Sequence, residues 1–268
     1  MALSNSVEKG RLRPMIASYI ICTTPRSGST LLCKLLASTG KAGQPDSFYH
    51  RPEFMREWAD EWGLSDTGTL SKSDFERAYL AAAIKAGDAG TGIFGLRLQQ
   101  EYLGLLSQTL DLIYPKLLSD RDRFERAFGR TVYLHLTRED KVAQAVSLVK
   151  AEQSGLWHIN ADGTELERLA APQEIHYDFE RIHREVVALE HDDHAWDIWF
   201  KQQEITPMRI RYEALDENPL GTLIRIFDAF EVEPPNLGNI QAEVAKLADV
   251  ESLEWMCRFR ADLQSAAK

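Results

Sequence analysis

Residues 23–32 hold side chains whose types and spacing indicate an anion-binding site. The apolar run at residues 16–22 has the length of a buried strand, and Pro25 ends it because proline has no donor for the strand ladder. Gly28 permits a close backbone approach, and the serines and threonine around it suit a helix N-terminus, which attracts anions through unpaired N–H groups and its dipole. Arg26 adds a planar donor suited to phosphate or sulfate. The residues predicted to bind the anion are Arg26, Ser27, Gly28, Ser29 and Thr30.

This loop differs from two common phosphate-binding loops. A nucleoside-triphosphate P-loop needs G-x-x-x-x-G-K-[ST], whereas here Ser29 follows Gly28 directly and the loop contains no lysine. A tyrosine-phosphatase loop needs five residues between its cysteine and arginine, but Cys22 and Arg26 are separated by three. The pattern argues against a kinase, an ATPase or such a phosphatase, and leaves an ordinary serine-rich turn as the alternative without a ligand.

A second basic site is predicted after the strand at residues 130–136. Arg138 follows this strand, and the next helix, starting at Asp140, carries Ser147 about two turns along. One ligand with two phosphates could bridge Arg138 and Ser147, whereas the alternative for Arg138 is a surface ion pair with an adjacent acidic residue.

Three segments resemble one known family. The runs TTPRSGST (residues 23–30) and QAVSLVKAEQSGLW (residues 144–157) resemble the bacterial sulfotransferase family typified by mycobacterial trehalose 2-sulfotransferase. The run LADVESLEWMCRFR near the C-terminus resembles the closing segment of that family, and the likeness extends over residues 17–262. It implies an α/β, P-loop-like three-layer fold with a mainly parallel central sheet flanked by helices.

The resemblance also implies a reaction. Members transfer the sulfuryl group of 3′-phosphoadenosine 5′-phosphosulfate (PAPS) to a hydroxyl group, and the co-substrate leaves as adenosine 3′,5′-bisphosphate. By this likeness the loop at Arg26 would bind the 5′ end, and Arg138 and Ser147 would bind the 3′-phosphate. The expected acceptor is a carbohydrate or glycolipid, no metal is required, and the family precedent is a homodimer. A non-catalytic phosphonucleotide-binding protein and a P-loop phosphotransferase remain the alternatives.

The general base is where this chain departs from the family. Trehalose-type members carry a glutamate two residues after a proline in the loop after the first helix, where this chain has Ser47, and Gln44 replaces the glutamate before that proline. The remaining candidates are His50 and Asp46. An unperturbed histidine has a pKa of about 6.5, which suits proton removal at neutral pH. We therefore predict His50 as the base, with Asp46 orienting or replacing it.

Other polar and aromatic residues near this loop are candidates for binding the acceptor. They are Gln44, Ser47 and Tyr49 in the loop, and Arg97 at the end of a predicted strand at residues 90–98. For Arg97 the alternative is a structural ion pair. Phe54, Trp58 and Trp62 recur every four residues on a predicted helix, which suits either core packing or an acceptor platform.

The composition narrows the class of protein. The formal net charge is −10 over 268 residues, which disfavours nonspecific binding to nucleic acid or anionic lipid. The three cysteines show no paired spacing and are expected to be free, buried thiols. The N-terminal segment resembles neither a signal peptide nor a membrane span, so we expect a cytoplasmic protein with no integral membrane segment. We predict one domain over residues 1–268, with residues 1–15 flexible.

The rest of the chain shows further helix and strand patterns. The run HDDH at residues 191–194 invites a metal site, but such runs are more often solvated helix faces. Helices are predicted at residues 73–86, 102–118, 174–203 (with a break at 191–193), 219–230, 241–248 and 251–264, a last strand at 208–212, and a mobile loop over the site at 155–172.

Overall fold

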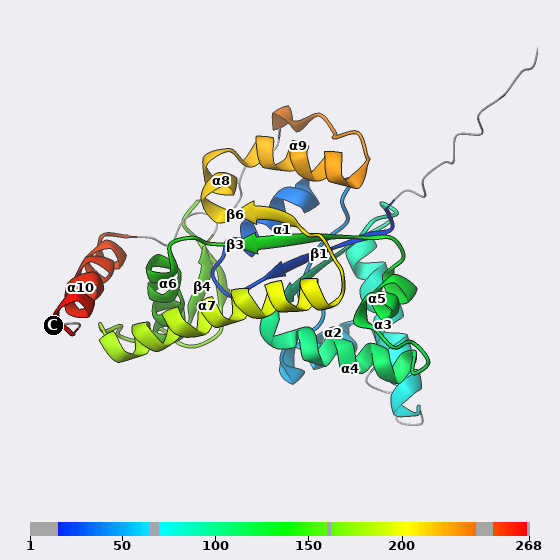
Figure 1. Ribbon diagram of the computed structural model, residues 1–268, viewed down its shortest axis with the longest axis horizontal. Helices are drawn as coiled ribbons and strands as arrows, with labels where there is room; N and C mark the ends of the chain where they lie inside the picture. Colours follow the sequence, from blue (N-terminus) through cyan, green and yellow to red (C-terminus); the bar gives the residue numbers. More distant parts are fainter. Residues whose placement is uncertain (1–15, 65–69, 160–161, 240–248, 267–268) are drawn as a thin grey trace, which may run out of the picture.

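A parallel four-stranded sheet forms the centre of the protein. The structure, a computed structural model, describes residues 16–64, 70–159, 162–239 and 249–266. The strand order is β2-β1-β3-β6, and every neighbouring pair is parallel (Figure 1). The strands are β1 (Ser18–Thr23), β2 (Phe94–Gln99), β3 (Thr131–Thr137) and β6 (Met208–Arg211). The predicted α/β architecture with a mainly parallel sheet is confirmed.

Both faces of the sheet are covered by helices, as the continuous apolar sequence of β1 requires. Tyr19 and Ile21 point to one face, and Ile20 and Cys22 point to the other. The first face packs against α1 (Ser29–Ser38) and α9 (Pro219–Phe230), with α8 (Tyr212–Glu217) beside them. Gly40 follows α1 with a positive φ of 64°, a conformation that glycine adopts readily at the end of a helix.

The second face carries a larger, aromatic-rich cluster of side chains. It is built by α2 (Pro52–Glu61), α3 (Lys72–Asp88), α4 (Leu103–Ile113), α5 (Asp120–Phe128) and the C-terminal part of α7 (Phe179–Gln202). A 3₁₀ turn, η1 (Gln100–Tyr102), connects β2 to α4. The single helix predicted at residues 102–118 is wrong: α4 ends at Ile113, and α5 begins after Ser119, whose side chain accepts a bond from the N–H of Asp122.

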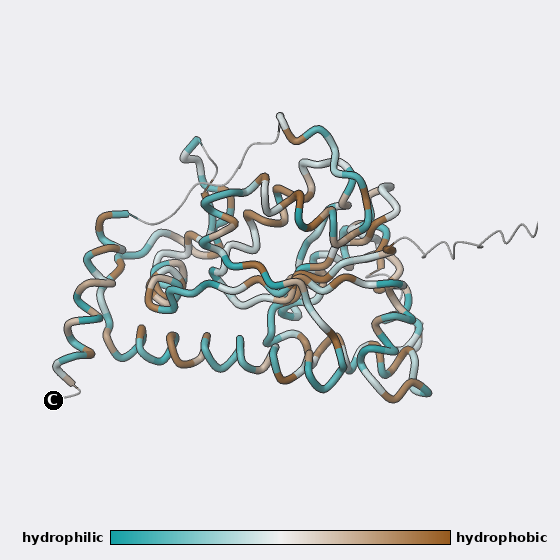
Figure 2. Tube along the Cα trace, turned by 45° about the horizontal axis from the view of Figure 1, so that its top comes forward, coloured by the Kyte–Doolittle hydropathy of each residue, from teal (hydrophilic) through white to brown (hydrophobic). Residues whose placement is uncertain are grey.

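A third cluster joins α6 (Lys141–Ser154), α7 and α10 (Val250–Ala266). The break predicted in α7 is also wrong, because the helix continues through residues 191–193. Figure 2 shows hydrophilic and hydrophobic residues alternating along this long helix, as expected when one side packs against the domain. A 3₁₀ turn, η2 (Leu237–Asn239), follows α9, and the helix predicted at 241–248 lies outside the described residues.

The mobile loop predicted at residues 155–172 instead contains a hairpin. Strands β4 (Leu156–Ile159) and β5 (Glu165–Arg168) pair in antiparallel orientation. Gly155 ends α6 with a φ of 71°, and its carbonyl accepts a bond of 2.8 Å from the N–H of Leu169, which closes the base of the hairpin. The hairpin and α6 both contact the loop after β1, because Arg26 bonds to Ser147 of α6 and to Trp157 of the hairpin.

The prediction that the three cysteines are free, buried thiols is confirmed in part. All three are free thiols, but only Cys22 and Cys33 are buried, whereas Cys257 is exposed on α10. Burial raises the pKa of Cys33 to about 12, so its thiol is unreactive at neutral pH. Among the described residues, the structure contains no helix that is long and apolar enough to span a membrane.

Candidate active site

The loop between β1 and α1 has the backbone of an anion cradle. Arg26 has a φ of 59° and Gly28 a φ of 89°, so two residues in the left-handed region stand immediately before the first turn of α1. That conformation is unfavourable for arginine by on the order of 1 kcal/mol, which suggests that the loop shape serves a function. No side chain of the described residues caps this helix start. Its first N–H groups are therefore open to a ligand in the cavity that Gly28, Ser29 and Thr30 line.

Gly28 is required at its position for a second reason. A Cβ atom there would come within 2.9 Å of Cε2 of Tyr212, the first residue of α8. The aromatic ring thus lies directly against the loop backbone, and only glycine allows both the φ value and this contact.

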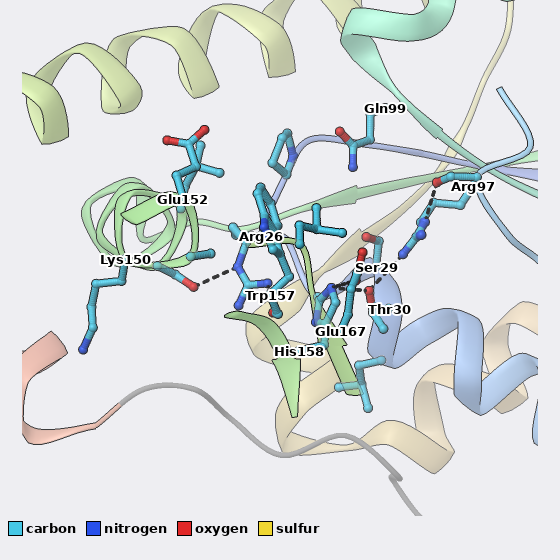
Figure 3. A pocket seen from close by; sticks show the side chains of 18 of the residues that line it. Arg26, Ser29, Thr30, Arg97, Gln99, Lys150, Glu152, Trp157, His158 and Glu167 are labelled. Carbon is cyan, nitrogen blue, oxygen red and sulfur yellow. Dashed lines mark hydrogen bonds and ion pairs between the residues drawn. The ribbon is translucent and has the colours of Figure 1, made fainter. Parts of the chain in front are cut away.

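Arg26 points into the cavity and is held by two contacts. Its Nε donates to Oγ of Ser147 at 3.0 Å, and its Nη1 donates to the carbonyl oxygen of Trp157 on the hairpin (Figure 3). Burial, and then the positive charge of Arg138, lower the pKa of Arg26 to about 10. The guanidinium still carries its charge at neutral pH, in a position where an anion is favourable.

Arg138 lies on the other side of the loop backbone, after the end of β3. Its Nη1 donates to the carbonyl oxygen of Arg26 at 3.3 Å, and its guanidinium carbon lies 4.7 Å from the centre of the Tyr212 ring. Arg26, Arg138 and Ser147 line one continuous cavity of about 940 Å³. The two blocks of sequence predicted to bind one ligand therefore do meet, although Ser147 contacts Arg26.

Arg97 organises the opposite wall of the cavity. Its Nε donates to Oγ of Ser47 at 2.7 Å, its Nη1 to Oγ1 of Thr30 at 2.9 Å and its Nη2 to Oδ1 of Asp46 at 3.3 Å. Asp46 Oδ1 also accepts a bond from the backbone N–H of Ser47. One arginine thus connects α1 with the loop at residues 46–47, so Arg97 is an ion-pair partner and a cavity residue at once.

His50 lines the same cavity, at the start of α2. Its ring packs edge-on against Phe54, with centres 4.9 Å apart, and against Tyr102 at 4.4 Å. Within the described parts of the chain, its buried Nδ1 has no hydrogen-bond partner. Burial, and then the charges of Arg51 and Arg97, lower the pKa of His50 to about 4. The imidazole is therefore neutral at pH 7, but a pKa of about 4 makes it a weaker base than the value of about 6.5 on which its prediction rested.

Three predicted site residues do not line the cavity. Gln44 is exposed outside it, and the Tyr49 side chain is fully buried against Tyr79, with ring centres 5.7 Å apart. Ser27 is also fully buried, and its hydroxyl is hydrogen-bonded to the hydroxyl of Thr23. Only the backbone of Ser27 can therefore contribute to an anion site. The predicted residues that line the cavity are Arg26, Gly28, Ser29, Thr30, Asp46, Ser47, His50, Arg97, Arg138 and Ser147.

The hairpin supplies cavity residues that the sequence analysis missed. His158 Nε2 lies 3.0 Å from Oγ1 of Thr30 and 3.5 Å from Oε2 of Glu167, and Figure 3 shows this group beside Arg26. Burial, and then the charges of Arg26 and Arg97, lower the pKa of His158 to about 3, while burial raises the pKa of Glu167. The short segment around these residues is of mixed polarity and gives no local signal for these roles, which depend on the packing of the hairpin beside the loop.

The aromatic residues of α2 divide between the two expected roles. Phe54 and Trp58 line the cavity, whereas Trp62 does not. Trp58 stacks on Trp62 with ring centres 5.3 Å apart and contacts Phe48 of the core at the same distance. Trp58 therefore packs against the core and also offers a surface to a ligand.

The geometry of residues 191–194 does not support a metal-binding site there. Among the described residues, no group of three or more His, Cys, Asp or Glu side chains could hold a metal ion. His191 is exposed and contacts Asp192, whereas Asp193 turns inward and pairs with Lys141.

The fold and the cavity together define an α/β protein with an arginine-bearing anion loop at the carboxyl edge of a parallel sheet. The chain belongs to the Stf0 sulphotransferase family, whose pattern matches residues 18–262. A trehalose 2-sulfotransferase of Mycobacterium tuberculosis is 27% identical over 264 residues, which covers 92% of this chain and 96% of that protein. A trehalose 2-sulfotransferase of Mycolicibacterium smegmatis is 28% identical over 268 residues, with the same shares of both chains covered.

One solved structure with similarity to this chain is the sulfotransferase domain from the Synechococcus PCC 7002 olefin synthase. It has a TM-score of 0.43 and 16% sequence identity, and the match covers 92% of this chain and 95% of that one.

Proposed function

We propose that this protein transfers the sulfuryl group of PAPS to a hydroxyl group of a carbohydrate acceptor. The observation that carries the proposal is the convergence of Arg26, Arg138 and the open start of α1 on one cavity. A donor with phosphate groups at its 5′ and 3′ positions needs two cationic contacts a few ångströms apart, and a single-phosphate ligand does not. The family membership of the chain supports the same reaction.

The donor would be held by charge and by backbone dipoles. Arg26 and the N–H groups at the start of α1 would bind the 5′-phosphosulfate and stabilise the charge that develops on the bridging oxygen. Arg138, with Tyr212 beneath it, would bind the 3′-phosphate. Ser147, whose hydroxyl lies 3.0 Å from Nε of Arg26, would add a hydroxyl contact to the 3′-phosphate once the donor is bound.

The transfer itself is an in-line displacement. The acceptor oxygen forms a bond to sulfur while the bond from sulfur to the 5′-phosphate oxygen breaks, and the acceptor proton moves to a base. We propose His50 as that base, because it lines the cavity as a neutral imidazole. Asp46 is held by Arg97 and the N–H of Ser47, a geometry that suits positioning the loop rather than proton transfer.

The acceptor end of the cavity favours an uncharged polyol. Glu57 and Glu61 of α2 and Glu101 of η1 line it together with Phe54 and Trp58. Carboxylates accept hydrogen bonds from sugar hydroxyl groups and repel an anionic acceptor, while aromatic faces suit the apolar side of a sugar ring. The relatives in Mycobacterium tuberculosis and Mycolicibacterium smegmatis are named for trehalose, which is such a polyol.

The test is a transfer assay with sulfur-labelled PAPS and a panel of neutral sugars that includes trehalose, alongside calorimetric titrations of adenosine 3′,5′-bisphosphate and of ATP with magnesium. We expect labelled product with at least one sugar, and bisphosphate binding that is tighter than ATP binding. Bisphosphate binding without transfer to any sugar or glycolipid would instead indicate a binding protein. Binding of ATP with magnesium but not of the bisphosphate would overturn the proposal.

A further inference from the structure

Behind the anion loop, four side chains form a closed hydrogen-bonded ring that no role described so far explains. They are Thr24 of the loop, Lys141 and Gln144 of α6, and Asp193 of α7, and we call them the Asp193 ring. Thr24 and Gln144 are fully buried, and the side chains of Lys141 and Asp193 are 14% and 17% exposed. Buried polar groups are retained when every donor is satisfied, so the bonding of this ring is informative.

The ring uses the bonding capacity of its members almost completely. The ammonium of Lys141 has three donors, and it contacts Asp193 Oδ2, Gln144 Oε1 at 2.9 Å and the carbonyl oxygen of Arg138 at 2.6 Å. The amide nitrogen of Gln144 donates to Oγ1 of Thr24 at 3.0 Å and to the carbonyl oxygen of Pro25 at 2.6 Å. Thr24 then donates to Oδ1 of Asp193 at 3.2 Å, which closes the ring.

Two bonds leave the ring, and each ends on one of the two anion-binding loops. The Lys141 bond ends on the backbone of Arg138 itself, and the Gln144 bond ends on Pro25, directly before Arg26. The uninterrupted α7 adds a third anchor, because Trp196, one turn after Asp193, donates from Nε1 to the carbonyl oxygen of Thr23 at 2.9 Å. The ring therefore fixes the backbones that carry the two arginines relative to each other.

We propose that Asp193, Lys141 and Gln144 are positioning residues that set the spacing between the two phosphate sites, so that a bisphosphate binds better than a monophosphate. This inference rests on the proposed function, since it assumes that one donor spans both arginines. A ligand with two anionic groups gains from the second contact only when both sites are already at the right separation. A monophosphate uses one site and gains nothing from the fixed spacing.

The experiment compares the dissociation constants of adenosine 3′,5′-bisphosphate and adenosine 5′-monophosphate by calorimetry on the full chain. The variant is Asp193→Asn, which keeps the acceptor for Thr24 and removes the charge facing Lys141. The matched control is Asp197→Asn, one turn further along α7, whose partner Arg209 belongs to β6 and to neither loop. We expect Asp193→Asn to weaken bisphosphate binding about tenfold and monophosphate binding less than twofold, while Asp197→Asn changes neither.

A second variant separates positioning from loss of the fold. Lys141→Met combined with Asp193→Leu removes both charges together, which avoids leaving an unpaired buried charge, and its thermal melt is measured beside the calorimetry. We expect the same selective loss of bisphosphate affinity in the folded double variant. Equal weakening of both ligands, or no weakening of either, would overturn the inference. If the unmodified protein showed no preference for the bisphosphate, the proposed function would fail instead.

Discussion

In the Asp193 ring behind the anion loop the side-chain donors are paired, whereas in front of the loop a ring nitrogen of His50 is not. In the Asp193 ring the three donors of Lys141 and both amide donors of Gln144 have acceptors. In front of the loop, Nδ1 of His50 is buried without a partner among the described residues, and the pKa of His50 is lowered to about 4. The loop therefore lies between two walls. The rear wall is the Asp193 ring, whose donors are all paired, and the front wall is formed around His50, where a buried nitrogen has no hydrogen-bond partner.

The difference has a physical meaning. Satisfied buried networks fix geometry, and a site for a donor with two phosphates needs fixed geometry more than it needs further charge. Unsatisfied groups with shifted pKa values destabilise the folded protein, and they persist where a substrate completes them. This difference agrees with the proposal that the rear wall places the donor, and that the front wall with its hairpin serves the chemistry and the acceptor.

The largest effect is expected when the charge between the two walls is removed. Arg26→Met deletes the guanidinium proposed to face the donor, and kcat/KM for sulfate transfer should fall about a thousand-fold, because a preorganised charge at the developing oxyanion is lost. Steady-state kinetics with labelled PAPS measure it. The control is Arg56→Met. Arg56 is an exposed arginine on α2, away from the anion loop, so this variant should retain full activity. A loss below tenfold in Arg26→Met would show that the donor binds elsewhere.

His50→Gln tests the front wall alone. The substitution keeps a polar side chain but removes the proposed proton acceptor, so kcat should fall about a hundred-fold while the dissociation constant for adenosine 3′,5′-bisphosphate stays within twofold. Because the pKa of His50 is lowered to about 4, the imidazole is unprotonated above that pH, and the activity of the unmodified enzyme should decline as the pH falls through about 4. The variant should lack this acid limb.

The control for His50→Gln is His194→Gln, since His194 is exposed on α7. If His50→Gln lowers kcat less than tenfold, or retains the acid limb, another cavity group accepts the proton.

Gly28→Ala tests the contact between the loop and Tyr212. An alanine at this position would have to adopt a φ near 89°, and its Cβ would overlap the Tyr212 ring. The loop must therefore shift, and bisphosphate affinity should weaken about tenfold. Gly40→Ala is matched to it, because Gly40 also has a positive φ, of 64°, yet its Cβ would meet no atom within 4 Å. Gly40→Ala should lower the melting temperature without changing the affinity. Equal affinities in the two variants would show that the Tyr212 contact does not shape the loop.

The parts predicted from the sequence are those fixed by local signals. The apolar run, proline, glycine and serines around Arg26 are adjacent in the chain, and they form β1, the loop and α1 as predicted. Arg138 follows a strand that pairs directly with β1, so its approach to the loop follows from parallel topology. In contrast, α5 is strongly polar and buries few residues, with Phe124 and Phe128 one turn apart, so its pattern was too weak to predict it.

The parts that were missed depend on distant contacts. Asp193 looks like part of a solvated charged run, and its inward role appears only through Thr24, 169 residues away along the chain. The hairpin strands are four residues long, and the pKa values of His158 and Glu167 are shifted mainly by burial under the folded hairpin, which no sequence neighbour signals. The left-handed φ of Arg26 has no sequence signal, because arginine rarely adopts it.

The smallest and most discriminating effect concerns Glu167 on the hairpin. Its carboxylate lies close enough to Arg26 and Arg97 to be lowered in pKa by both, although burial raises that pKa more strongly. A negative charge there opposes an anionic donor, so Glu167→Gln should tighten adenosine 3′,5′-bisphosphate binding about three- to fivefold at pH 8, an alkaline pH chosen because it favours the ionised carboxylate. Glu165→Gln is the control on the same strand, since Glu165 pairs with Arg168 and does not line the cavity. Weaker binding in Glu167→Gln would mean that this residue holds the donor, and the hairpin would then belong with the donor wall.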